Sequence, residues 1–117
     1  MSPVTIAITT LLAALLVFTA IRKLSHRESV VRSYLRVGVR EERLNLLAAI
    51  LLGAAAGLLA GLVWPPVGLA AGIGLVGYFA VAVASHVRAG DLEHVATPVV
   101  YWLLAAGVAV LHLLALV

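Results

Sequence analysis

Apolar residues dominate this chain in four long runs, at about residues 3–21, 44–63, 67–87 and 98–117. Each run is apolar on nearly all sides of a helix, which is typical of lipid-embedded helices and not of a soluble bundle. A helix needs roughly 20 mainly apolar residues to cross a membrane. Only helices or closed barrels satisfy the backbone in hydrocarbon, and runs without alternating polarity exclude a barrel. The pattern therefore predicts an all-α membrane protein with four spans.

The connections between these runs differ. Trp64, Pro65 and Pro66 predict a tight turn between the second and third runs, whereas a longer polar segment joins the first run to the second. Within that segment, apolar residues recur at helical spacing between Val30 and Leu35, with arginines mainly on other faces. We therefore expect an amphipathic helix along the membrane interface.

We expect this interfacial helix to cover residues 25–37. Ser25 followed by Glu28 fits a capping box, in which the serine hydroxyl accepts from the backbone N–H of Glu28. Gly38 is a natural stop for the helix. The whole chain, residues 1–117, is then a single transmembrane domain, a four-helix bundle of the left-handed type.

Composition agrees with a membrane location. Of the 117 residues, 64% are apolar and 11% are charged, and the mean hydropathy is +1.18. A soluble domain of this size could not bury so much apolar surface. The chain has no cysteine, which excludes disulfide exchange and thiol nucleophiles.

Charged residues lie in only two of the connections, and they predict the orientation. Arg88 follows the third run, and the other basic residues lie between the first and second runs: Arg22, Lys23, Arg27, Arg32, Arg36, Arg40 and Arg43. The positive-inside rule places both connections on the cytoplasmic side and both termini outside. The acidic residues share these connections, so no charge need enter the membrane, which argues against an ion-coupled transporter. With a net charge of +3, we expect membrane lipids and no nucleic acid as partners.

Glycines form a stripe at the second and third runs. Gly53, Gly57 and Gly61 are spaced four residues apart, and Gly68 and Gly72 repeat the spacing. Small residues allow helices to approach closely in lipid. We expect this stripe to pack helices within the bundle, and it indicates no activity.

The histidines do not predict a metal site. His26, His86 and His94 lie near the basic connections, whereas His112 lies within the last run, roughly 21 Å deeper at 1.5 Å per residue. Two histidines one helical turn apart, as metal sites often have, are absent. We expect no metal site, and we expect His112 to hydrogen-bond across to a threonine or a backbone carbonyl of another helix.

A polar cluster follows the third run, and it has two interpretations. His86, Arg88 and Asp91 could anchor and close the helix, with Gly90 in a left-handed conformation. Alternatively, Lys23 joins His86 and Arg88 in a cationic rim, with Asp91 as the nearest counter-charge. Such a rim could hold an anionic head group, a quinone carbonyl or an acidic segment of a partner. His86 and Arg88 are two apart on a helix and point to different faces, so convergence requires the helix to end near residue 87.

Several segments together resemble the DoxX-like family of small bacterial four-helix membrane proteins. They are IRKL, LRVGV, GLLAGLVWPP and SHVRAGD, and they are spread over nearly the whole chain. The most specific positions are Lys23, Gly57, Gly61, His86, Arg88, Gly90 and Asp91. Many members carry an acidic residue early in the second helix, near where this chain has apolar Ile50 and Leu51.

The resemblance implies a bacterial inner-membrane protein, and most of its relatives have no assigned reaction. The family takes its name from a subunit associated with a terminal quinol oxidase. This implies a non-catalytic subunit or assembly factor of a redox-linked complex, which would bind a membrane redox partner or a second copy of the chain. The alternative is a site inside the bundle for a quinone or another lipophilic substrate, with enzyme activity left open. The sequence indicates no cofactor and no catalytic residue.

Overall fold

The structure, a computed structural model, describes residues 2–117, and this part of the chain contains helices and no strand. In chain order the elements are α1 (Pro3–Ser25), α2 (Glu28–Arg36), the short 3₁₀ helix η1 (Glu41–Arg43), α3 (Leu44–Ala60), α4 (Pro65–Arg88), the 3₁₀ helix η2 (Leu92–His94) and α5 (Ala96–Leu116). Helices α1, α4, α5 and the combined η1 and α3 are long and apolar enough to cross a membrane. The predicted all-α fold with four spans is confirmed.

Helix ends follow local chemistry. The Ser2 side chain accepts from the backbone N–H of Thr5 at 3.2 Å, and Pro65 and Pro66 open α4, where a missing N–H is tolerated. Gly38 and Gly90 follow α2 and α4 with φ of +86° and +72°. Both glycines therefore adopt the left-handed conformation that the sequence predicted for helix ends.

The predicted capping box is wrong. Ser25 is the last residue of α1, and its hydroxyl donates to the Arg22 carbonyl at 2.5 Å. His26 then turns the chain in a left-handed conformation, with φ of 50°. Helix α2 starts at Glu28 without a side-chain cap, because α1 extends four residues beyond its predicted end at residue 21 and uses Ser25. The interfacial helix is consequently shorter than the predicted 25–37.

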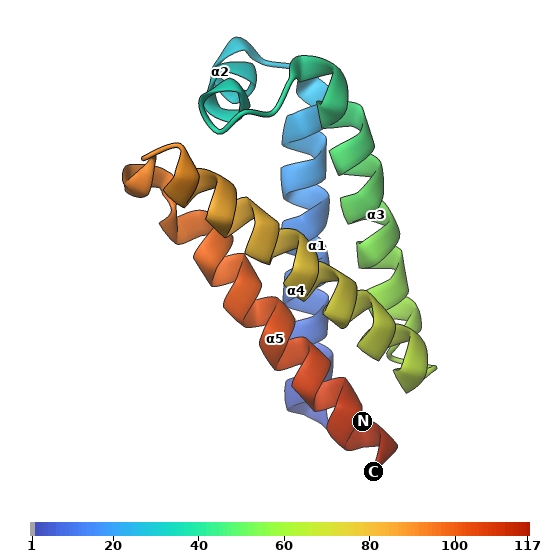
Figure 1. Cartoon of the computed structure of the whole chain (residues 1–117). Coiled ribbons are helices and arrows are strands. Elements are labelled where there is room, and N and C mark those ends of the chain that lie inside the picture. The colour runs from blue at the N-terminus through green and yellow to red at the C-terminus, as the bar shows by residue number, and fades with distance from the viewer. Residues whose placement is uncertain (1) are drawn as a thin grey trace.

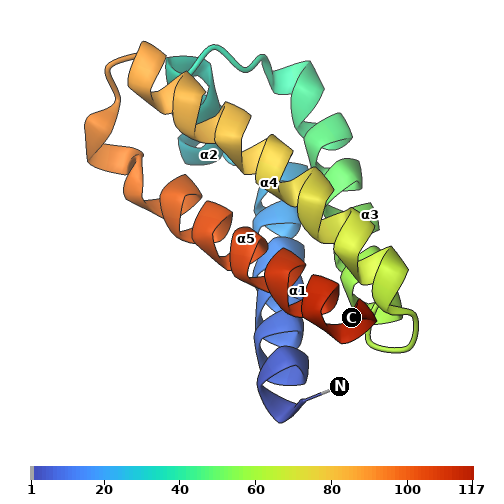
Figure 2. The same ribbon diagram turned by 60° about the horizontal axis from the view of Figure 1, so that its bottom comes forward.

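The four long helices are arranged in the cyclic order α1, α3, α4, α5, so that α1 lies diagonally opposite α4. Figures 1 and 2 show an α1–α3 pair against an α4–α5 pair, with α2 beside the junction of α1 and α3. Fully buried side chains at the centre include Leu12, Leu16, Leu51, Leu58, Leu75 and Val108. Many other apolar side chains face outward, as expected for helices in contact with lipid.

The two ends of the bundle differ in composition. We call the end with α2, η1 and η2 the basic end, because it holds the arginines and the carboxylates. The other end, called here the terminal end, holds the Trp64 turn and both chain termini (Figure 1).

Glycines bring the backbones together at the terminal end. A Cβ on Gly61 would lie 2.3 Å from the Cα of Gly68, and one on Gly68 would lie 2.3 Å from the His112 ring. A Cβ on Gly72 would lie 3.1 Å from the Cα of Ala109. A side chain cannot fit at the closest of these contacts, so α3, α4 and α5 depend on glycine there.

The two glycines of the predicted stripe that are farther from the Trp64 turn, Gly57 and Gly53, are packed less closely. A Cβ on Gly57 would approach the Cβ of Ala71 at 3.1 Å, whereas one on Gly53 would meet nothing within 4 Å. Gly53 is exposed on the outside of α3. The packing role expected for Gly53 is therefore wrong: the contact between α3 and α4 tightens toward the turn that joins them, and Gly53 lies away from that turn.

Candidate functional site

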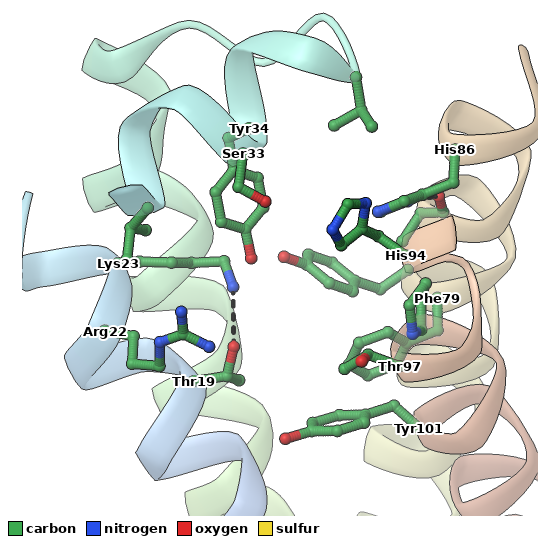
Figure 3. A pocket seen from close by; sticks show the side chains of 15 residues that line it. Thr19, Arg22, Lys23, Ser33, Tyr34, Phe79, His86, His94, Thr97 and Tyr101 are labelled. Carbon is green, nitrogen blue, oxygen red and sulfur yellow. Dashed lines mark hydrogen bonds between the residues drawn. The ribbon is translucent and has the colours of Figure 1, made fainter. Parts of the chain in front are cut away.

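A cavity of about 250 Å³ lies at the basic end, between the α1 and α2 side and the α4 and α5 side. Figure 3 shows its two walls facing each other, with Lys23 and Arg22 on one wall and His86 and Tyr101 on the other. Helix α2 contributes Tyr34 from above, and η2 contributes His94. The cavity is therefore assembled from five helical segments that belong to two distant parts of the chain, residues 19–37 and 78–101.

Lys23 is the main polar feature of the first wall. Its side chain is almost completely buried, with 3% of the residue exposed. The ammonium donates to the Thr19 hydroxyl at 3.0 Å and lies 4.7 Å from the centre of the Tyr34 ring. Ion pairs among the described residues do not include it. Since an ammonium has three N–H donors, Lys23 keeps donors for a further acceptor.

Helix α2 holds Tyr34 over this lysine. Val30, one turn earlier, is 3% exposed and attaches α2 to the bundle. Burial raises the pKa of the Tyr34 phenol, so the phenol is neutral at physiological pH and can donate a hydrogen bond. The face of its ring stabilises the neighbouring ammonium by a cation–π interaction.

Aromatic rings form most of the apolar lining. Phe79 packs between Tyr78, at 4.9 Å between ring centres, and Tyr101, at 5.2 Å. All three tyrosines of the chain line the cavity, and so does its sole lysine. These rings lie between α1 and the α4–α5 pair at this end. Glycines in their place would allow the helices to approach more closely.

Histidines supply polar groups on the second wall. The Nδ1–H of His86 donates a hydrogen bond to the Ala82 carbonyl at 2.9 Å. In the neutral ring, Nε2 is then an acceptor. His94 uses Nδ1 for an Asp91 carboxylate oxygen at 2.6 Å. This hydrogen bond, more than any other interaction, lowers the pKa of Asp91 below its ordinary value. Asp91 thus holds His94 at the cavity edge.

The structure separates the residues predicted for the cationic rim. Lys23 and His86 both line the cavity, whereas Arg88 and Asp91 do not. Helix α4 continues without a break through Arg88, which is exposed, so the geometry that convergence required is absent. Arg88 has the position of an anchor at the helix end, and Asp91 acts on the cavity through His94.

The sequence did not identify several other residues that line the cavity. Thr19, Tyr78 and Tyr101 lie inside apolar runs and looked like ordinary span residues, and Tyr34 looked like part of an apolar helix face. One signal was present, because tyrosines are amphipathic: Tyr34 lies in the polar connection, and Tyr78 and Tyr101 lie in the halves of their spans nearest the basic connections.

Two other histidines have structural positions. His26 follows α1 and contacts Glu41 at 3.3 Å and Asn45 at 2.8 Å, which ties α1 to the start of α3. His112 is completely buried, and its Nδ1 donates to the Val108 carbonyl at 2.9 Å. This bond lies within α5 and does not cross to another helix as expected, and the buried Nε2 has no hydrogen-bond partner among the described residues. Across residues 2–117, no group of three or more histidine or acidic side chains could hold a metal ion.

Comparisons with known proteins give one match. The model of the DoxX-like family matches residues 7–108, which is most of the chain. No curated protein and no solved structure matches. The chain therefore belongs to the DoxX-like family, and it is a multi-pass membrane protein.

Proposed function

From this family membership and the cavity, we propose that the protein binds a small lipophilic molecule, of which quinones are one class, with the polar end of the ligand at the basic end of the bundle. One observation carries the proposal: the Lys23 ammonium is 3% exposed and borders a cavity without a carboxylate partner. This is the binding function that the sequence left open as an alternative.

The energetics of Lys23 support a ligand. A buried ammonium loses several kcal/mol of hydration and needs a partner to recover it. The hydroxyl of Thr19 and the ring of Tyr34 supply part of that stabilisation. An acceptor oxygen on a ligand, such as a quinone carbonyl, would supply the rest. An uncharged residue would fill the space at lower cost if the role were only structural.

The size of the cavity limits the ligand. Drug-sized ligands occupy sites of roughly 300–1,000 Å³, whereas an engineered cavity of about 150 Å³ holds benzene. A cavity of about 250 Å³ therefore suits one ring system with small substituents. Any long alkyl tail would extend beyond it into the lipid.

The orientation belongs to the same proposal. The positive-inside rule places the basic end, and thus the cavity, on the cytoplasmic side of a bacterial inner membrane. The subunit or assembly role implied by the resemblance stays a prediction. A redox partner or a second copy could bind the same protein, because the outer faces of the helices lie away from the cavity.

Cysteine labelling tests this orientation, because the chain has no cysteine of its own. In intact cells, a membrane-impermeant thiol reagent should react with Ser2→Cys and should not react with Ser29→Cys, which is exposed on α2. Both variants should react after the cells are opened. The reverse pattern in intact cells would place the basic end outside.

Ligand binding is tested with three purified proteins in mild detergent. The parent, Lys23→Met and Arg43→Gln are titrated with a short-chain ubiquinone by calorimetry, and their lipid extracts are compared by mass spectrometry. Arg43 is exposed and lies outside the cavity, so it is the matched control. We expect the parent and Arg43→Gln to bind ubiquinone or retain a common lipophilic compound, and Lys23→Met to lose it. Equal binding by all three proteins would contradict the proposal.

A further inference from the structure

We propose that the cavity at the basic end selects an acidic ring: a planar conjugated ligand whose ionised oxygen faces Lys23. This inference rests on the proposed function and narrows its ligand class. A neutral quinone would satisfy the proposed function alone. The acidic ring adds a negative charge and a requirement for planarity, and each has its own support in the structure.

The first support is the charge of the walls. Arg22 and Lys23 both line the cavity, and among residues 2–117 no aspartate or glutamate does. The carboxylates of Glu28 and Glu41 pair with side chains outside it, and the carboxylate of Asp91 binds His94 on the second wall, away from Arg22 and Lys23. The cationic wall therefore has no internal counter-charge, and an anionic ligand would complete it.

The second support is the supply of hydrogen-bond donors around the lysine. The ammonium uses one N–H for Thr19, and the neutral phenols of Tyr34 and Tyr78 lie on the same cavity. An ionised oxygen accepts several hydrogen bonds, and bonds to charged groups are roughly twice as strong as neutral ones. The lining near Lys23 thus offers several donors to an ionised oxygen and, among residues 2–117, no carboxylate that would repel it.

The third support is the shape of the lining. Four aromatic residues line the cavity, namely Tyr34, Tyr78, Phe79 and Tyr101. The chain has seven aromatic residues in total, as two Trp, three Tyr and two Phe, and the other three are exposed on the outside of the bundle. Aromatic walls favour a flat ring by stacked or edge-to-face contact. An alkyl phosphate or a lipid head group would gain no such contact.

A matched pair of ligands tests the charge. Lawsone is a hydroxynaphthoquinone that is ionised at neutral pH, and its methyl ether has the same ring without the charge. Calorimetry or equilibrium dialysis with the full chain in detergent should show at least tenfold tighter binding of lawsone. Equal affinity for the two would overturn the inference and leave the proposed function standing. Binding of neither compound, nor of ubiquinone, would instead contradict the proposed function.

A third compound and two variants complete the test. Hexyl phosphate carries a charge without a ring, and we expect it to bind at least tenfold more weakly than lawsone; equal affinity would overturn the requirement for a ring. In Lys23→Met the preference for lawsone over its ether should disappear, and in Lys23→Arg it should persist. An unchanged preference in Lys23→Met would place the anion elsewhere and overturn the inference. If Lys23→Met does not elute as a folded protein, the comparison of the three compounds on the parent decides.

Discussion

The two ends of the bundle each bury a nitrogen-bearing side chain within a span, yet they treat it in opposite ways. At the terminal end, the His112 ring packs against Gly68 and donates to its own helix. At the basic end, Lys23 borders a cavity and keeps unused donors. The first arrangement is closely packed beside the ring, although the buried Nε2 of His112 has no hydrogen-bond partner within the described part of the chain. The second leaves a cavity, which the proposed ligand would fill.

Side-chain size explains the difference. Gly61, Gly68 and Gly72 let three helices approach until their backbones nearly touch, which maximises dispersion contact in lipid. At the other end, Phe79 and Tyr101 occupy the space between helices and prevent the same closure. The comparison teaches that close packing is concentrated at one end, and that the cavity on which the proposed function rests lies at the other.

The largest effect is expected when the closed end is forced open. Gly61→Leu places a side chain where the Gly68 backbone lies, and overpacking typically costs about 1–3 kcal/mol. The unfolding temperature of Gly61→Leu in detergent, measured by size-exclusion chromatography after heating, should be well below that of the parent. The unfolding temperature of Gly57→Leu should lie between those of Gly61→Leu and the parent, because a Cβ on Gly57 meets only the Ala71 Cβ at 3.1 Å.

Gly53→Leu is the matched control, because a Cβ on Gly53 meets nothing within 4 Å. It should unfold at nearly the temperature of the parent. If Gly61→Leu and Gly53→Leu behave alike, the terminal end is not the closely packed region described above.

The second effect has the opposite sign. Lys23→Met removes a buried ammonium without a carboxylate partner and keeps an apolar chain of similar length. Replacing buried charges by apolar residues is often stabilising, by about 1–4 kcal/mol for ion pairs, and we expect a gain of about 1 kcal/mol in the ligand-free protein. Thermal unfolding in detergent without added ligand measures it, and Lys23→Arg should show no such gain. A clear loss of stability in Lys23→Met would mean that the lysine holds the fold together.

A smaller effect concerns His26, which ties α1 to α3. The hydrogen bond to Asn45 is the main cause of a raised pKa for His26, and Glu41 adds to it. The stability contributed by protonated His26 is therefore fully present below the ordinary pKa of 6.5 and is lost as the pH rises through the pKa of the folded protein, where the ring keeps one of its two N–H donors. NMR titration of the His26 ring should give a midpoint above 6.5, and Asn45→Ala should lower it. A midpoint at or below 6.5 in the parent would show that the tie is absent.

Local patterns predicted the elements of this fold, because each signal lies within a few neighbouring residues. The four spans follow from apolar length, and Gly38 and Gly90 end helices as their type suggests. The sequence also placed Lys23 and His86 among its candidates, since polar groups at span ends are few. The cavity itself could not be predicted, because it depends on how α2 folds back from His26 and brings Tyr34 over Lys23. The same limit explains the error at Gly53, since spacing within a helix does not reveal where two helices diverge.

Chemical protection of Lys23 tests the central claim most directly, because this residue is the sole lysine of the chain. A small amine-reactive reagent is applied to the detergent-solubilised parent with and without saturating lawsone, and the modified Lys23 peptide is quantified by mass spectrometry over time. The account predicts that lawsone slows the modification of Lys23 at least fivefold, while its methyl ether protects less at the same concentration. Bound lawsone that leaves the rate of modification unchanged would contradict the account, because the ligand would then lie away from Lys23.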